Sequence, residues 1–231
     1  MRTTLSQAAI AALLLLTGTL AGCGPQVGAI LYHSGLIPED KTKEQFKLTQ
    51  NRLVILIDDP TGALPNSELR GTIHNTLASE LMAHKACGPI VAYNDVMKIE
   101  RTSRDFDNMS IRAIGEQLQA EQVLHVSIQT FSTGKEAKLG VYQGQAQAFV
   151  KVCSTEKKPH VRLWPATGEG QFVEVTQPGE QSDQWGSKSV ADSYSQAIAA
   201  RLAKRIAMLF YEHPTEAERN LAVGRNEQPQ R

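Results

Sequence analysis

The pattern of apolar and polar positions predicts a folded domain that begins near residue 51. Residues 53–57 form a continuous apolar run, as expected of a strand buried on both faces. From residue 67 to residue 84, apolar residues recur every four positions, which predicts an amphipathic helix. Residues 142–152 alternate, with small apolar side chains on one face and glutamines on the other, as in an antiparallel strand with one wet face.

Shorter patterns complete the predicted order of elements. They indicate a strand near residues 90–92, two helices at about 94–102 and 108–119, a strand at about 121–131, two strands at about 160–165 and 171–177, and a last helix at about 187–212. Pro214 ends that helix. The predicted fold class is α/β, a single mixed-sheet domain with helices packed on one side of the sheet, in the order β-α-β-α-α-β-β-β-β-α.

The first residues have the features of an export signal. Arg2 supplies a positive charge, and no charged residue occurs from Ala8 to Gly22. This apolar stretch is shorter than the ~20 residues that a membrane span needs, and small residues end it, as in a secretory signal. We therefore divide the chain into a signal peptide (1–22), a tether (23–50), the α/β domain (51–212) and a polar C-terminal tail (213–231).

The end of the signal resembles a bacterial lipobox. Leu20-Ala21-Gly22-Cys23 places a cysteine after two small residues. The resemblance implies that the Cys23 thiol receives a diacylglyceryl group, that cleavage precedes Cys23, and that its new amino group is acylated, for example with palmitate. Several acyl chains together anchor a protein stably. Gly24 follows the cysteine, which by the same resemblance favours the outer membrane, with the domain in the periplasm. The alternative is a plain secreted protein with a stray cysteine.

Composition narrows the classes of partner. The chain is neutral overall, and from Cys23 onward it carries one base fewer than it carries acids. Nothing in this balance attracts nucleic acid, so no nucleic-acid partner is expected. The only predicted cofactor-like group is the covalent lipid on Cys23.

Two further cysteines remain. Export makes a disulfide between Cys87 and Cys153 chemically feasible, although the sequence cannot show that the two residues come close enough. The alternative is a pair of half-buried thiols. No C-x-x-C motif suggests a zinc or redox site.

Catalytic motifs are weak. Residues 132–135 and 154–157 each match S-x-x-K, the nucleophile signature of penicillin-recognising enzymes. Both matches fall in expected turns between strands, whereas the chemistry needs the serine at a helix start, and the companion motifs are missing. We therefore predict that the protein is not an enzyme. The histidines show no metal-ligand spacing, and His125 is expected on the sheet surface.

Several residues remain candidates for binding. Asp58 and Asp59 stand at the carboxyl end of a buried strand, where α/β folds often bind ligands and where carboxylates could hold Mg²⁺ or Ca²⁺. The alternative is that they only shape the turn at Pro60. Trp164 could be an interface anchor or could pack a loop. Polar residues of the alternating strand form a second candidate interface: Gln143, Gln145 and Gln147.

A longer pattern resembles a family of envelope lipoproteins. The segments "LVILIDDP", "IGEQLQAEQVLHVSI" and "VRLWPATG", after a lipobox, resemble a group that includes the curli secretion protein CsgG, the penicillin-binding-protein activator LpoB and the amino-terminal domain of TolB. Glu121 stands where that group usually has Asp. The resemblance covers about residues 50–212.

The resemblance implies a non-catalytic domain that serves assembly or regulation. We therefore expect a lipid-anchored envelope lipoprotein acting through protein contacts as a scaffold, assembly factor or regulator, with other envelope proteins or a second copy as partners. The polar glutamine face argues against the lipid-facing hairpins of CsgG, and the tether is shorter than that of LpoB. The alternative is a lipid-anchored binding module for a small ligand or metal at Asp58-Asp59.

Overall fold

The computed structural model describes residues 40–134, 143–156, 162–178 and 188–215. The chain divides into two compact units, residues 1–40 and 41–231, and every described helix and strand belongs to the second unit. The predicted signal peptide, Cys23 and most of the predicted tether and tail lie outside the described residues. Among the described helices, none is long and apolar enough to cross a membrane.

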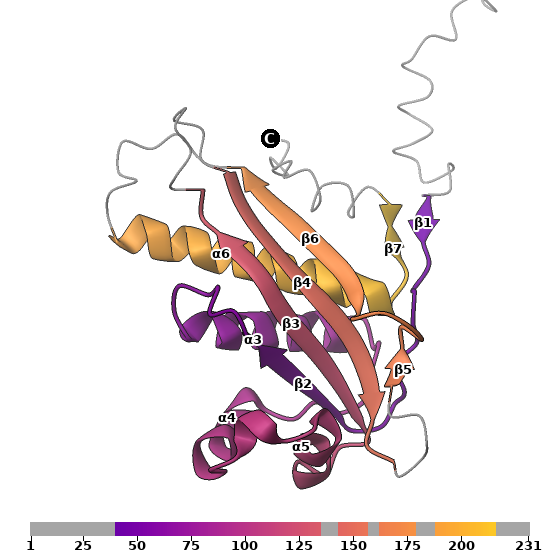
Figure 1. Ribbon diagram of the computed structural model, residues 1–231. Helices are drawn as coiled ribbons and strands as arrows, with labels where there is room; N and C mark the ends of the chain where they lie inside the picture. The colour runs from indigo at the N-terminus through magenta and orange to yellow at the C-terminus, as the bar shows by residue number, and fades with distance from the viewer. Residues whose placement is uncertain (1–39, 135–142, 157–161, 179–187, 216–231) are drawn as a thin grey trace, which may run out of the picture. The chain divides into compact units, whose positions relative to one another are not determined.

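The centre of the unit is a mixed sheet of five strands (Figure 1). Its strands are β2 (Leu53–Asp58), β3 (Gln122–Ser132), β4 (Gln143–Ser154), β5 (Arg162–Trp164) and β6 (Gln171–Pro178). The β2–β3 pair is parallel, and the other pairs are antiparallel. Strand β3 pairs with one edge of β4. Strands β5 and β6 each pair with a different part of β4. The mixed α/β class is therefore as expected.

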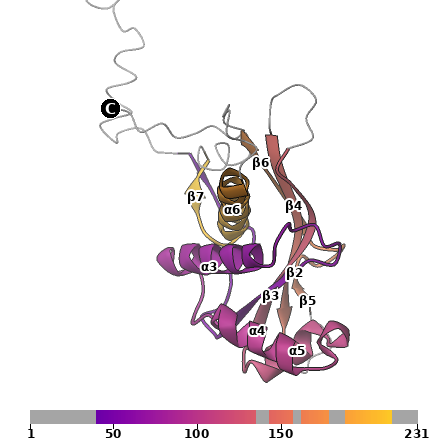
Figure 2. The same ribbon diagram turned by 90° about the vertical axis from the view of Figure 1, so that its left-hand side faces the viewer.

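Helices cover both faces of β2, not one side of the sheet as we expected. Helices α3 (Glu68–Ala83) and α6 (Lys188–Ala207) pack on one face (Figure 2), where Leu53 and Ile55 join the main core. Helices α4 (Tyr93–Thr102) and α5 (Ile111–Gln117) form a second, smaller core with Val54 and Leu56. Successive side chains of a strand point to opposite faces, so the unbroken apolar run of β2 fills both cores.

Short elements account for the other differences from the expected order. The strand expected near 90–92 is a single parallel bridge between Leu53 and Ile90. An unexpected antiparallel pair joins β1 (Lys41–Thr42) to β7 (His213–Pro214). The structure also contains two short 3₁₀ turns, η1 (Phe106–Asn108) and η2 (Met208–Phe210). The second of these follows α6, where we expected the helix to continue.

The end of the predicted tether belongs to the folded unit. Leu48 is buried in the main core, and Phe46 packs against that core. The backbone N–H groups of Gln45 and Phe46 donate to the carbonyl of Leu209 at distances of 2.8 and 3.2 Å. These contacts tie the segment entering the domain to the turn that follows α6.

Gly115 explains how α5 comes close to the sheet. A Cβ atom at this position would lie 2.6 Å from Cγ2 of Val123 on β3 and would also clash with Thr155. The Thr155 hydroxyl donates to the carbonyl of Ala120 at 2.7 Å, which fixes its rotamer. The glycine therefore lets Ile114 and Leu118 reach the smaller core.

Candidate functional site

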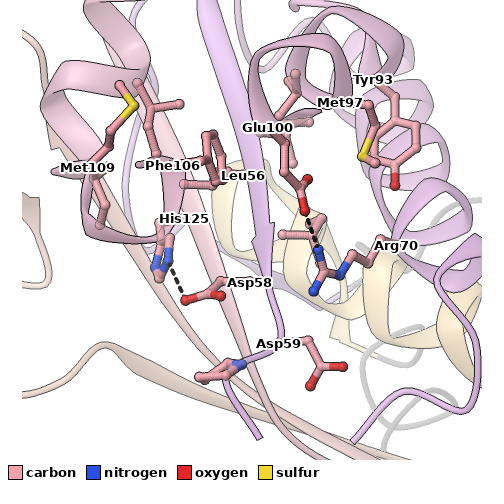
Figure 3. Close-up of a pocket in the computed structure, with 16 residues that line it drawn as sticks. Leu56, Asp58, Asp59, Arg70, Tyr93, Met97, Glu100, Phe106, Met109 and His125 are labelled. Carbon is pink, nitrogen blue, oxygen red and sulfur yellow. Dashed lines mark hydrogen bonds and ion pairs between the residues drawn. The ribbon is translucent and has the colours of Figure 1, made fainter. Parts of the chain in front are cut away.

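A cavity of about 390 Å³ opens at the carboxyl end of β2 (Figure 3). Its walls come from the end of β2, the first turn of α3, helices α4 and α5, the η1 turn and β3. It therefore lies at the end of the parallel strand pair, which is where open α/β sheets commonly bind ligands.

Asp58 and His125 form a polar pair in the lining of this cavity. The His125 Nε2 atom lies 3.5 Å from the Asp58 Oδ2 atom, and the side chains are 7% and 50% exposed, respectively. The contact with His125 holds the pKa of Asp58 below its ordinary value, while partial burial opposes that shift. The His125 Nδ1 atom is buried and has no hydrogen-bond partner among the described residues. We had expected His125 on the sheet surface, but α5 and the cavity rim cover that part of the sheet.

Asp59 has a different role from its neighbour. Its Oδ1 atom accepts a hydrogen bond from the Ala63 N–H at 2.8 Å, and its Oδ2 atom accepts one from the Leu64 N–H at 3.1 Å. Both oxygens therefore order the turn between β2 and α3. Asp59 lines the cavity, but the carboxylate that pairs with His125 belongs to Asp58.

An ion pair links two helices across the cavity. The Arg70 Nη1 atom on α3 lies 3.1 Å from the Glu100 Oε1 atom on α4, and about a quarter to a third of each side chain is exposed. Arg70 also contributes to the lowered pKa of Asp58. Burial raises the pKa of Tyr93, whose ring stands beside this pair. The guanidinium is therefore paired with Glu100 and acts electrostatically on Asp58.

The rest of the cavity is apolar. Leu56, Val96 and Ile114 are almost completely buried at its floor. Met97, Phe106 and Met109 form the walls that face one another in Figure 3. The cavity therefore has one charged end and one apolar end. No cluster of three or more His, Cys, Asp or Glu residues suited to a metal occurs in the part of the chain that the structure describes.

The predicted glutamine interface lies on what we call the outer sheet face, the side of β3, β4 and β6 opposite α3 and α6. Gln145 and Gln147 both donate to Oε1 of Glu174 on β6, the latter at 2.8 Å. Gln147 also accepts a hydrogen bond from the Thr130 hydroxyl at 3.0 Å. Gln143 is exposed at the start of β4. The three glutamines therefore share one face of the sheet, and two of them hold neighbouring strands together.

Two aromatic rings interrupt this polar ladder. Phe149 on β4 and Phe172 on β6 are register partners with ring centroids 5.7 Å apart. Phe172 is 45% exposed, although Val173 and Val175 of the same strand are buried in the core. No described helix covers the pair. The sequence of β4 could have indicated this pair, because Phe149 occupies a position that is polar elsewhere in the alternation of that strand.

Trp164 packs inside the unit. Its ring is 6.0 Å from that of Phe46 and 5.8 Å from that of Phe210, measured between centroids. It therefore joins β5 to the segment that enters the domain and to η2, and its ring is partly buried against the main core. Of the two alternatives for Trp164, this is the packing of a loop.

The two described cysteines are free and buried. Cys87 belongs to the main core, whereas Cys153 is the register partner of Val123, which lies in the smaller core. The sheet separates the two thiols. Burial raises the pKa of both, that of Cys87 to about 11, so the thiolate is disfavoured.

The serines of the two S-x-x-K matches end strands. Ser132 closes β3 and Ser154 closes β4, so neither begins a helix, and the matching lysines, Lys135 and Lys157, lie outside the described residues.

Comparisons with known proteins give distant likenesses only. No family model matches the chain, and no curated protein matches it in sequence. Among solved structures, the chain is similar to lipoprotein GNA1162 from Neisseria meningitidis, with 9% identity over 66% of this chain and 97% of that one and a TM-score of 0.43. It is also similar to protein CT253 from Chlamydia trachomatis, with 15% identity over 67% and 92% and a TM-score of 0.40. The PelC dodecamer from Paraburkholderia phytofirmans matches with 10% identity over 74% and 96% and a TM-score of 0.38. Likenesses this distant assign neither a family nor a function.

Proposed function

We propose that the chain is a lipid-anchored lipoprotein of the bacterial cell envelope that acts without catalysis, through contacts with other envelope proteins. Leu20-Ala21-Gly22-Cys23 supplies the anchor, and Gly24 favours the outer membrane with the domain in the periplasm. The resemblance to the CsgG, LpoB and TolB amino-terminal-domain group supports a role as scaffold, assembly factor or regulator. A membrane-bound domain meets its partners near that membrane, so a contact surface is the feature that this function requires.

The observation that carries this proposal is the aromatic pair on the outer sheet face. Phe172 is 45% exposed, stands beside Phe149, and is flanked by the hydrogen-bonded pair Gln147 and Glu174. Exposed aromatic rings within a polar rim are typical of protein contact surfaces, in which a few large side chains supply most of the binding energy. Strand β6 also pairs with no described strand other than β4, so it is an edge strand among the described residues.

The test compares two equally simple variants in the cells that make the protein. Phe172→Glu should remove specific co-purifying envelope proteins from the detergent-solubilised chain. Met82→Glu is the matched control, because Met82 is 60% exposed on α3, away from the outer sheet face. If both variants keep the same partners as the unchanged chain, contact through the outer sheet face is refuted.

A second candidate function is a lipid-anchored binding module. The observation that favours it is the cavity at the end of β2, which combines an apolar wall with Asp58, His125 and Arg70. Its volume of about 390 Å³ lies within the range of small-molecule sites, about 300–1,000 Å³. A saturable rise in melting temperature with small ligands or divalent metals, reduced by Asp58→Asn, would support this candidate. The absence of any such rise across both classes would contradict it.

A further inference from the structure

We propose that the cavity at the end of β2 binds an organic cation, namely an ammonium or guanidinium group carried on an apolar or aromatic stem. This inference rests on the second candidate function, the binding module, and specifies the chemistry of its ligand. Three features of the cavity carry it: the balance of charge at its polar end, the half-exposed carboxylate of Asp58, and the apolar residues that line the rest of the cavity.

The polar end has more acid than permanent base. Asp58 and Glu100 face the cavity, and Arg70 is the only lysine or arginine among the described residues that line it. The carboxylate of Asp59 is already used by two backbone N–H groups. The lowered pKa of Asp58 keeps that group ionised at neutral pH. A cation entering between these acids gains attraction, whereas an anion would have to displace Glu100 from Arg70 and approach Asp58.

The Asp58–His125 pair presents the Asp58 carboxylate to the cavity. In the neutral tautomer that donates Nε2–H to Asp58, the Nδ1 atom is a bare acceptor. The side chain is only 7% exposed and Nδ1 has no partner among the described residues, so its lone pair is left unsatisfied in a buried place. Nδ1 is shielded from the cavity, so the group that a ligand meets is the half-exposed Asp58 carboxylate, to which an ammonium or guanidinium can donate and which would repel a carboxylate or phosphate.

The apolar end of the cavity determines the rest of the ligand. Met97, Phe106 and Met109 line it with flexible thioethers and one aromatic ring. Such side chains adapt to an aromatic or branched stem of modest size. The volume of about 390 Å³ suits one small molecule or one side chain of a peptide. The shared chemistry could therefore come from a free amine or from a Lys or Arg side chain next to an apolar residue.

The chain offers built-in reporters for a direct test. Its sequence contains five methionines, and Met97 and Met109 line the cavity whereas Met82 and Met208 do not. The purified acylated chain, labelled with ¹³C at the methionine methyl groups, is titrated in detergent with phenethylammonium, 2-phenylethanol and 3-phenylpropionate. These probes share an aromatic stem and differ in their head group. A fourth probe, an acetylated and amidated Phe-Arg dipeptide, separates a peptide source from a free amine.

We expect saturable shifts of the Met97 and Met109 signals with phenethylammonium, at the millimolar concentrations typical of so small a ligand. The Met82 signal reports any non-specific partition into detergent. The alcohol should bind about fivefold more weakly and the carboxylate more weakly still, since a partly exposed charge contact is worth a factor of this order. Tighter binding of the dipeptide than of the amine would identify a peptide side chain as the source, and the reverse order would identify a free amine.

Asp58→Asn should reduce the affinity for phenethylammonium about fivefold, to that of the alcohol. Glu212→Gln is the matched control, because the Glu212 side chain is 51% exposed and its carboxylate lies 3.4 Å from the Lys41 ammonium, outside the cavity. Equal binding of the alcohol and the amine would overturn the cation preference and leave the binding module standing. Tightest binding of the carboxylate would overturn it as well. If no probe shifts Met97 or Met109, both the cation site and the binding module are refuted.

Discussion

Helix propensity predicts that Gly115→Ala stabilises the protein, whereas the structure predicts that the same substitution destabilises it. Gly115 lies inside α5, and replacing an interior helical glycine with alanine ordinarily stabilises a helix by about 1 kcal/mol. Here the new Cβ atom would stand 2.6 Å from Cγ2 of Val123 and would also clash with the methyl group of Thr155. Both neighbours are β-branched and therefore stiff, and the hydroxyl of Thr155 is held by the Ala120 carbonyl.

The expected cost follows from these contacts. Overpacking a close-packed core costs about 1–3 kcal/mol, and two stiff neighbours place this site in the upper half of that range. After subtraction of the helix gain of about 1 kcal/mol, the unfolding free energy should fall by about 1–2 kcal/mol. For a domain of this size, the melting temperature should drop by roughly 2–8 °C. Circular dichroism of the purified chain on heating measures this.

A double-mutant cycle with Thr155→Ser isolates the clash. This change removes the offending methyl group and keeps the hydroxyl that bonds to Ala120. Alone, Thr155→Ser should cost about 0.8 kcal/mol for the lost methyl group. In the Gly115→Ala background, it should cost nothing or stabilise the fold, a coupling of about 1 kcal/mol. Additive effects, or a stabilised Gly115→Ala variant, would refute the proposed close approach of α5 to the sheet.

Three further predictions concern the anchor, a buried histidine and the turn after β2. Cys23→Ser should abolish acylation and leave uncleaved precursor by mass spectrometry, and normal membrane partition of that variant would contradict the lipoprotein assignment. Burial lowers the pKa of His74 below its ordinary 6.5. As the pH falls, this histidine therefore takes up a proton more readily in the unfolded chain than in the folded one. The unfolding free energy should accordingly decrease as the pH drops below about 6.5. His74→Phe should flatten that dependence in urea titrations, while His84→Gln, which alters a half-exposed imidazole, should keep it. Asp59→Ala should lower the unfolding free energy by about 1–3 kcal/mol because two backbone N–H groups lose their acceptor, and an unchanged urea midpoint would count against that role.

Periodicity was a sufficient guide where an element is long and faces one core. The four-residue repeat of α3 and the alternation of β4 each correspond to an observed element with the expected buried face. The strand expected near residue 90 is only a bridge, and the pairing of β1 with β7 was not expected, because two-residue elements carry no detectable period. Helices on both faces could have been inferred from the unbroken apolar run of β2.

The candidate site shows a different limit. Asp58 was identified because it directly follows a buried strand. Its partner His125 was assigned to the surface, since alternation along β3 indicates two faces but not which helix covers one of them. Only the parallel register, in which Leu56 pairs with His125, brings the imidazole beside Asp58. The Arg70–Glu100 pair depends on the crossing of α3 and α4, which local sequence does not encode.

The proposal of a membrane-anchored protein that acts through its outer sheet face is tested most directly by crosslinking in intact cells. A photoreactive residue in place of Phe172 should give specific crosslinks to envelope proteins, and the same residue in place of Met82 should not. The Phe172 crosslinks should be lost when Cys23→Ser removes the predicted anchor. Crosslinks of equal yield and identity from Phe172 and Met82, or none from Phe172 in the acylated protein, would contradict the account.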